Sequence, residues 1–183
     1  MEASREVLIL VDADVIIHLF KADKASLLNK LYQGRIRMLY IVLTELLNNR
    51  TVRNVVGNLL TYKQVEEIKF PTSSNLAMFQ EYLILRKTLK GMGESASLVY
   101  CKQNKHIIAS SNMKDIRDFC ETNDIAYLTT LDILSIALKR GILNEAEIDR
   151  SIRQITRNNE SHLCCKTIAA HLQSHFNPEK ILY

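Results

Sequence analysis

Residues 7–17 read Val-Leu-Ile-Leu-Val-Asp-Ala-Asp-Val-Ile-Ile, an apolar run that is interrupted by Asp12 and Asp14. Most of its apolar residues are β-branched, which is typical of a strand buried on both faces, so we expect residues 7–11 to form such a strand. The two carboxylates then follow the carboxyl end of the strand, which is the edge of an open parallel sheet where ligands bind. Asp12 fits equally well as the cap of a following helix.

The composition is that of an ordinary globular protein. The chain has 183 residues, of which 47% are hydrophobic and 24% charged, and this suits one domain with an appendage. The apolar run at residues 7–11 is too short to span a membrane, and no basic segment of a signal peptide precedes it. The 4 cysteines form no CxxC motif, and a chain of this length needs no disulfides, which fits a reducing cytoplasm.

The net charge of +4 is unevenly distributed along the chain. Residues 144–183 hold five basic and five acidic residues, so residues 1–143 hold 19 of the 24 Lys and Arg and 15 of the 20 Asp and Glu. A basic body around an acidic pocket would suit a polyanionic substrate that is held near a metal ion. The same charges also fit a solvated surface with no ligand.

Helical and strand patterns alternate after the first strand. This alternation predicts an α/β fold, a three-layer α/β/α sandwich with a mainly parallel central sheet over residues 1–143. Residues 144–183 are expected to form a helical C-terminal extension. The further predicted strands are residues 36–43, 106–110 and 125–128. The predicted helices are residues 23–32, 95–103, 112–122 and 129–139. A further helix is expected to begin after Thr44 as its cap, and most of residues 51–90 are expected to be helical.

Further polar residues follow the later predicted strands. Glu45 comes after the strand at 36–43, and Glu94 lies in Gly91-Met92-Gly93-Glu94, which opens a helix. A glutamate in the first turn of a helix is stabilised by the free N–H groups there and is well placed for a site. Asn112 and Asp115 follow the strand at 106–110 within Ala-Ser-Ser-Asn-Met-Lys-Asp.

These residues, in this order and at these intervals, resemble the motifs of the PIN-domain nucleases. Residues 131–143 also resemble the family branch that includes many toxins of bacterial and archaeal toxin-antitoxin pairs. The likeness covers about residues 5–143 and implies a Mg²⁺- or Mn²⁺-dependent hydrolase that cuts single-stranded RNA. It also implies a homodimer and, for a toxin, an antitoxin protein as partner.

The resemblance implies roles for individual residues. Three or four carboxylates at one sheet edge can hold a hard divalent cation, which supplies a nucleophilic water and neutralises charge on the phosphate. By similarity Asp12, Glu45 and Glu94 are catalytic ligands, and Asp14, Ser110 and Ser111 support them.

The fourth acidic position of the family is occupied by Asn112, which offers a carbonyl oxygen but no charge. Asp115 lies three residues further on, on the same face of a helix, so we take it as the fourth catalytic carboxylate. The expected metal ligands are thus Asp12, Glu94, Asp115 and Asn112, with Glu45 beside them.

Two other interpretations remain open for the same residues. Asp12-Ala-Asp14 after a strand resembles the nucleophile motif of haloacid-dehalogenase-like phosphatases, although the later aspartate pair of that family is replaced by Ser110-Ser111-Asn112. A PIN-like module that binds RNA or protein without cutting is the non-enzyme alternative, because the fourth acid is missing.

The extension carries two apolar stripes at helical spacing. Ile148, Ile152 and Ile155 form one, and Leu163, Ile168 and Leu172 suggest the other. We expect them to dock on the nuclease body or on a second copy of the chain, and the resemblance favours self-association because the family commonly forms dimers.

The extension also holds a possible structural zinc site, made of His162, Cys164, Cys165, His171 and His175. His171 and His175 share a helical face. Adjacent cysteines on a helix cannot both face one metal, however, and no CxxC is present, so we expect a reduced, helical surface or interface segment instead.

Overall fold

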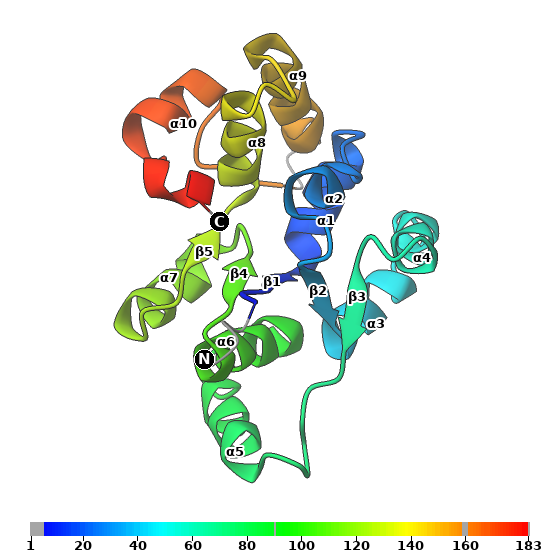
Figure 1. Cartoon of the computed structure of the whole chain (residues 1–183), viewed down its shortest axis with the longest axis vertical. Helices are drawn as coiled ribbons and strands as arrows, with labels where there is room; N and C mark the ends of the chain where they lie inside the picture. Colours follow the sequence, from blue (N-terminus) through cyan, green and yellow to red (C-terminus); the bar gives the residue numbers. More distant parts are fainter. Residues whose placement is uncertain (1–5, 90, 159–160, 183) are drawn as a thin grey trace.

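A parallel sheet of five strands lies at the centre of the described part of the chain, which comprises residues 6–89, 91–158 and 161–182 of the computed structural model (Figure 1). The strands are β1 (Ile9–Val11), β2 (Ile36–Leu39), β3 (Glu66–Ile68), β4 (Ile107–Ala109) and β5 (Tyr127–Leu128). Their order is β3-β2-β1-β4-β5, and every pair is parallel. The predicted α/β class is therefore confirmed.

The central strand is the one that opens the chain. Ile9, Leu10 and Val11 are buried, and Ile9 pairs in register with Ile36 of β2 and with Ile107 of β4. The chain builds the sheet from β1 through β2 to β3 on one side and then crosses to β4 and β5 on the other. The strand order thus reverses at β1, and the crevice beyond its carboxyl end is where open α/β sheets bind ligands.

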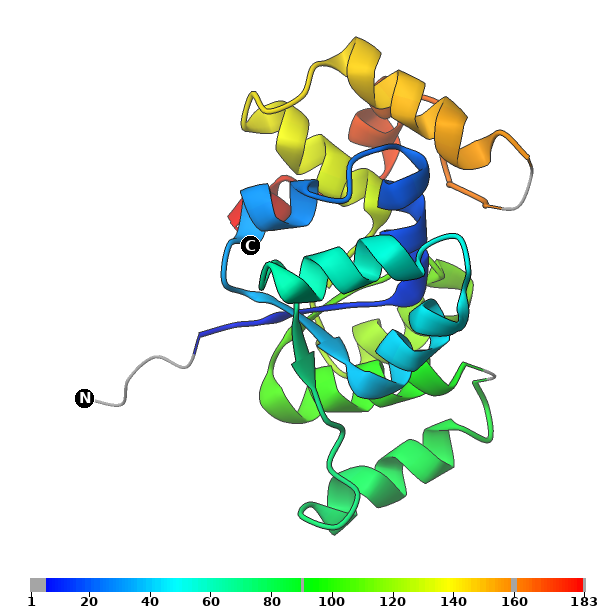
Figure 2. The ribbon, with the colours of Figure 1, turned by 90° about the vertical axis from the view of Figure 1, so that its right-hand side faces the viewer.

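Helices cover both faces of the sheet and give the three-layer sandwich (Figure 2). On one side α1, α2 and α8 pack together, and on the other α6 packs against α5 and α7, while α3 contacts both α1 and α6. The helices are α1 (Ala13–Lys21), α2 (Leu27–Tyr32), α3 (Tyr40–Asn48), α4 (Arg53–Thr61), α5 (Leu76–Leu85), α6 (Met92–Asn104), α7 (Met113–Thr122), α8 (Thr130–Lys139), α9 (Glu145–Thr156), α10 (Ile168–Ser174) and the 3₁₀ turn η1 (Pro178–Leu182). In the described ranges, no helix has the length and apolar character that a membrane crossing requires.

Two predictions about the second strand and its helix were wrong. The strand ends at Leu39 and α3 begins at Tyr40, so Thr44 does not cap this helix and Glu45 lies in its second turn. The hydroxyl of Thr44 instead donates to the carbonyl of Ile41 at 2.8 Å. A short apolar run such as residues 40–43 suits a buried helix as well as a strand, so its periodicity could not decide between them.

The strand β3 was missed, because its segment was expected to be mostly helical. Glu66 and Glu67 are exposed on this edge strand, so it lacks the apolar run of a buried strand. Its pairing with β2 is supported by an ion pair of 3.0 Å between Arg37 and Glu66. In a similar way the first crossover holds α1 as well as the predicted helix, which begins only at Leu27.

The C-terminal extension packs on the rest of the chain. Helix α9 contacts α1 and α8, and α10 contacts α8 and α9. Ile148, Ile152 and Ile168 belong to the same buried core as the sheet. The main-chain N–H of Ile168 donates to Asp149 at 2.8 Å, which ties α10 to α9. Both apolar stripes therefore find cover within one chain.

Candidate functional site

The carboxyl end of β1 places Asp12 at the reversal of the strand order. Its main-chain N–H donates to the carbonyl of Ala109 at 2.9 Å, which joins the ends of β1 and β4. Its side chain accepts from the N–H of Ala13 at 2.9 Å, so Asp12 also caps α1. The carboxylate of Asp12 can therefore serve both as a helix cap and as part of a site, because only its Oδ1 accepts from the N–H of Ala13.

Burial dominates the electrostatics of Asp12, whose side chain is 8% exposed. Burial raises the pKa of Asp12, the hydrogen bonds from Ala13 and Ser110 oppose this rise, and the charge of Glu45 adds to it. Glu45 is thus close enough to act on Asp12 although it belongs to α3. A buried carboxylate beside a second acid is stabilised in its ionised form by a nearby cation.

Helix α6 approaches α3 closely because Gly93 has no side chain. A Cβ at this position would lie 2.7 Å from Cγ2 of Val42, which is buried, and 3.5 Å from Oε1 of Glu45. The glycine therefore brings the first turn of α6, which carries Glu94, against α3, which carries Glu45. The close contact between Gly93 and Val42 explains why the Gly-x-Gly-Glu motif has a glycine immediately before Glu94.

Glu94 lies where the charges of three other elements meet. Burial raises its pKa to about 7, with further rises from the charges of Asp12, Asp115 and Asp14, while the hydrogen bond from Asn112 lowers it. These acids come from the junction of β1 with α1, from α1 and from α7, so carboxylates that are scattered along the sequence act on one another here. We call Asp12, Glu45, Glu94 and Asp115, together with Asn112, the acidic cluster.

Asn112 connects two members of the acidic cluster. Its Nδ2 donates to Oε1 of Glu94 and to Oδ2 of Asp115, each at 3.0 Å. Asn112 precedes α7 as its N-cap residue, and Asp115 lies in the first turn of that helix. The structure therefore places the amide and the acid three residues beyond it side by side, as the sequence analysis expected.

The supporting residues hold the segment that carries Asn112. Asp14 accepts from the N–H of Ser111 at 2.7 Å and from that of Val15 at 2.6 Å, so it ties the end of β4 to the start of α1. Burial, with the charge of Asp12, raises the pKa of Asp14 to about 7. The hydroxyl of Ser110, which is buried, accepts from the N–H of Asn112 at 3.3 Å.

A hydrogen-bonded chain behind this segment was not expected from the sequence. The hydroxyls of Ser111 and Thr130 lie 2.8 Å apart, and Thr130 Oγ1 lies 2.9 Å from Nδ1 of the buried His18. Burial, with the nearby charge of Lys21, lowers the pKa of His18 to about 4, so the imidazole is neutral at pH 7. A lone histidine in an apolar helix carries no signal of such a role.

The acidic cluster offers the oxygen ligands that hard divalent cations prefer. In the described ranges, no three of its carboxylates bring ligand atoms within 4.8 Å of one another; the group that meets this limit is Cys164, Cys165 and His175. Mg²⁺ keeps several waters and binds directly to one or two carboxylates, so it does not require a tighter set. Burial is the main cause of the raised pKa values of Asp12 and Glu94, and the charges of neighbouring acids add to the rise.

The cysteines of the extension do not lie on a helix, so that prediction was wrong. Cys164 and Cys165 fall in the segment between α9 and α10, while His171 lies within α10 and His175 ends it. The objection that adjacent cysteines on a helix diverge therefore does not apply. His162 is exposed and lies before them in the same segment.

A comparison of the sequence with models of known protein families finds no match, and a comparison with curated proteins finds no significant similarity.

Proposed function

We propose that this protein is a metal-dependent nuclease of the PIN type that hydrolyses phosphodiester bonds of single-stranded RNA. The observation that carries the proposal is the convergence of the acidic cluster at the carboxyl end of a parallel sheet, where the strand order reverses. Phosphodiester hydrolysis needs an activated water and neutralisation of charge on the phosphate. Carboxylates gathered at one edge serve both needs through a cation.

Mg²⁺ or Mn²⁺ would be held by Asp12, Glu94 and Asp115, and when bound it lowers the pKa of water and offsets phosphate charge. The carboxylate of Glu45 adds a further donor. Asn112 offers its side-chain oxygen to the cation only after its amide rotates, because its Nδ2 now faces Glu94 and Asp115. The protein's own part is positioning. The N–H of Ala13 and the hydroxyl of Ser110 hold Asp12, and the Asn112 amide aligns Glu94 with Asp115.

A pocket lined by aromatic side chains suits the bases of a single strand. It measures about 780 Å³, follows the ends of β2 and β3, and is walled in part by Thr44 of α3 and Ala96 of α6. Unpaired bases stack on aromatic rings, which makes single-stranded RNA a better fit than a duplex. The aromatic side chains that line it are Tyr40, Phe70, Phe79 and Tyr82.

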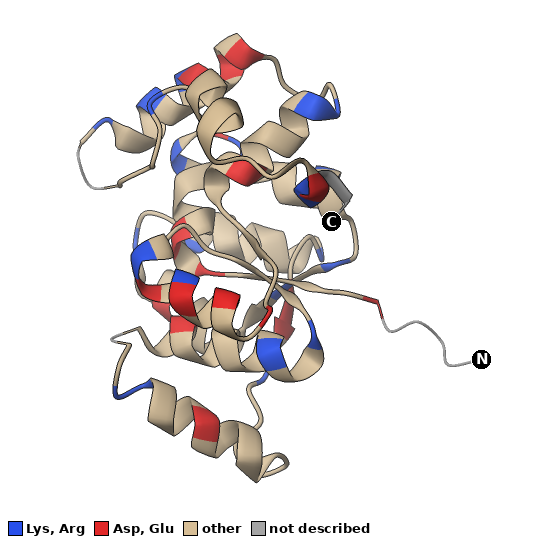
Figure 3. Ribbon diagram, turned by 90° about the vertical axis from the view of Figure 1, so that its left-hand side faces the viewer, with Lys and Arg blue, Asp and Glu red and all other residues tan. Residues whose placement is uncertain are grey.

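Basic and acidic residues are interspersed on the side where α7 lies, as Figure 3 shows. A cation held by the acidic cluster would add positive charge for a phosphate there. We place the enzyme in a reducing cytoplasm, where its thiols stay reduced.

The test is cleavage of a labelled single-stranded RNA by the full chain in EDTA and after addition of Mg²⁺ or Mn²⁺. We expect cleavage only with the cation, and its loss in Glu94→Gln. Asp118→Asn is the matched control, because Asp118 is an exposed acid of α7 outside the acidic cluster. Cleavage that continues unchanged in EDTA contradicts the proposal.

The main alternative is a PIN-like module that binds RNA without cutting it, which Asn112 in place of an acid favours. Binding of the same RNA by the wild type, with no cleavage in either cation, would support this alternative. A dimer, and an antitoxin partner for a toxin, are further proposals that sedimentation of the chain and the neighbouring gene would test.

The phosphatase interpretation is weaker than the nuclease. It needs a second aspartate that exchanges protons with the substrate. Asp14 holds that position, but its two oxygens accept from the main-chain N–H groups of Val15 and Ser111.

A further inference from the structure

Four side chains of the extension gather between α9 and the end of α10. They are Cys164, Cys165, His171 and His175, which we call the Cys/His cluster. Ligand atoms of Cys164, Cys165 and His175 all lie within 4.8 Å of one another. Nδ1 of His171 lies 3.8 Å from Sγ of Cys164, which adds a fourth candidate ligand.

These distances are close to those of a tetrahedral metal site. Zinc binds thiolate sulfur at about 2.3 Å and imidazole nitrogen at about 2.0 Å, so its ligand atoms lie roughly 3.3–3.8 Å apart. The His171–Cys164 distance already matches this range. His171 lies outside the group of three ligand atoms that are within 4.8 Å of one another, so Cys165 and His175 must move toward it for all four ligands to meet one ion. Cys164 and His175 are exposed and lie outside regular helix, so such a movement disturbs no packed core.

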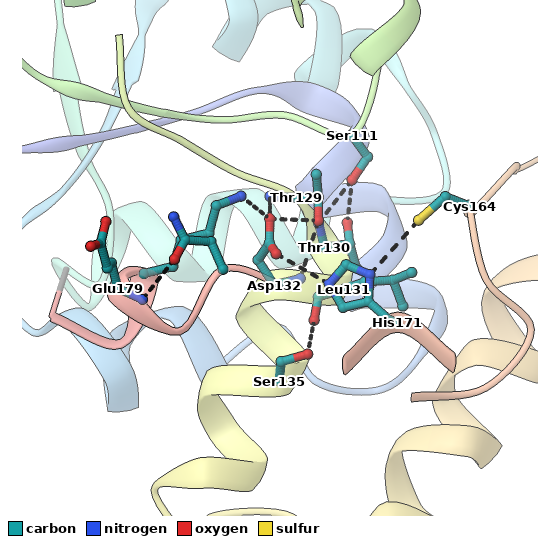
Figure 4. A network of polar contacts seen from close by, with 11 residues as sticks. Ser111, Thr129, Thr130, Leu131, Asp132, Ser135, Cys164, His171 and Glu179 are labelled. Carbon is teal, nitrogen blue, oxygen red and sulfur yellow. Dashed lines mark hydrogen bonds and ion pairs between the residues drawn. The ribbon is translucent and has the colours of Figure 1, made fainter. Parts of the chain in front are cut away.

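A carboxylate already orients His171 for this role. Nε2 of His171 lies 3.1 Å from Oδ1 of Asp132, and both side chains are almost fully buried (Figure 4). A neutral imidazole that donates from Nε2 presents the lone pair of Nδ1 to Cys164. Carboxylate–histidine pairs of this kind commonly fix the tautomer of a metal-binding histidine.

Asp132 is itself held in place by a second partner. The Nζ of Lys180 lies 2.7 Å from its Oδ2, so the carboxylate bridges His171 and Lys180. Asp132 also accepts from the N–H of Thr129 at 2.8 Å, within the capping box of α8. The support of His171 is thus part of the sheet-side body and does not depend on the extension alone.

The Cys/His cluster opens to solvent, because Cys164, His171 and His175 line a pocket of about 310 Å³ through which an ion can enter.

We propose that the Cys/His cluster binds one Zn²⁺ ion, which fastens α10 and the preceding segment to α8 through His171 and Asp132. Thiolate and imidazole ligands select zinc over Mg²⁺ and Mn²⁺. Four protein ligands leave no open position, so the site is structural. The site is chemically distinct from the acidic cluster and does not depend on the proposed nuclease activity.

The test is to load the reduced full chain with Zn²⁺ or Co²⁺, remove unbound metal and measure metal content and the thiolate-to-cobalt charge-transfer absorption. We expect about one ion per chain and the charge-transfer band of thiolate ligands. Zinc should also raise the melting temperature, since it binds the folded chain.

His175→Gln and Cys165→Ser should each weaken zinc binding by at least 10-fold. Removal of a residue that only supports a metal ligand already lowers affinity by about 10- to 100-fold, and these two residues are ligands themselves. His175 is exposed, so its substitution leaves the core intact. Matched controls are His162→Gln, an exposed histidine of the same pocket, and Cys120→Ala, a buried core thiol. A wild type without bound metal or charge-transfer band overturns the proposal, as does unchanged binding in both His175→Gln and Cys165→Ser.

Discussion

The acidic cluster and the Cys/His cluster are assembled in opposite ways. The acidic cluster draws Asp12, Glu45, Glu94 and Asp115 from four elements that are far apart in the sequence and meet at the end of the sheet. The Cys/His cluster comes from one short segment and relies on the body only through Asp132. Oxygen ligands at the sheet suit a hard, exchangeable cation for chemistry, whereas sulfur and nitrogen ligands in the extension suit a fixed one.

A hydrogen-bonded path joins the two regions. Asp14 accepts from Ser111, the hydroxyl of Ser111 accepts from the N–H of Thr130 at 2.9 Å, and the neighbouring Thr129 bonds to Asp132. Figure 4 shows this path running from Ser111 past Thr129 and Asp132 to His171. The extension thus supports the start of α8, which lies behind the segment that carries Asn112.

The largest expected effect is a substitution that abolishes RNA cleavage and leaves zinc binding unchanged. Asp12→Asn should lower RNA cleavage by more than about 100-fold, because the loss of mere supporting residues at metal sites already costs 10- to 100-fold. Its zinc content and cobalt spectrum should remain those of the wild type. Initial cleavage rates and metal analysis on the same preparations check this. A parallel loss of both properties would show that the clusters are not independent.

The close approach of α6 and α3 gives the next prediction. Gly93→Ala places a Cβ 2.7 Å from Val42 Cγ2, so α6 must shift and carry Glu94 with it. Displacement of a catalytic group by about 1 Å can cost about 100-fold, and we expect a loss of 10- to 100-fold in cleavage. Gly57→Ala is the control, since a Cβ at Gly57 meets no atom within 4 Å. Equal rates in both variants would contradict the proposed packing constraint.

Asn112 and Asp115 test which residue has taken the fourth acidic role. Asp115→Asn should lower cleavage by about 10-fold or more, Asn112→Ala should lower it less, and Asn112→Asp should retain or raise it by adding a charged ligand. The comparison uses cleavage rates at several Mn²⁺ concentrations, with Asp118→Asn as the exposed control. Small and equal effects at both positions would leave a site of three carboxylates.

The smallest expected effect is the pH dependence of stability. Burial raises the pKa of Glu94 and of Asp14 to about 7, so the folded chain keeps protons that the unfolded chain releases above about pH 4. Without a divalent cation, the free energy of unfolding should therefore fall as the pH rises from about 4 to about 7. Mg²⁺ or Mn²⁺ favours the ionised carboxylates, so the gain in melting temperature should be a few degrees larger at about pH 8 than at about pH 5.5.

Thermal unfolding of the wild type and of Glu94→Gln at both pH values checks this prediction. The variant carries no charge at this position and should show a smaller dependence. A cation effect that is the same at both pH values would show that the acids are ionised throughout.

The residues of the acidic cluster could be named from the sequence, whereas some of the elements around them could not. Strand β1 was recognisable because Ile9 to Val11 are apolar on both faces, and the carboxyl ends of parallel strands meet by geometry. Strand β3 was not, because Glu66 and Glu67 face solvent at the sheet edge and their strand state depends on pairing with β2. Tertiary pairing of this kind leaves no periodic signal in the sequence.

The same limit applies to the polar contacts behind the site. His18, Thr130 and Asp132 are common residue types at helix positions, and only the packing of α1 against α8 brings His18 to Thr130. The Cys/His cluster was visible as a set of residues, but its geometry depends on a segment between helices whose conformation the sequence does not specify. The sequence therefore identified the candidate ligands but could not predict that their side chains lie close together.

The most direct measurement of the central claim is cleavage of a single-stranded RNA that carries one 2′-deoxy nucleotide at a mapped cleavage position. If the acidic cluster directs water at the phosphate, the 2′-hydroxyl is not needed. The wild type should then cut this position with Mg²⁺ or Mn²⁺, and cutting should stop in EDTA and in Glu94→Gln but persist in His175→Gln. Cleavage that needs the 2′-hydroxyl and continues in EDTA would contradict the account.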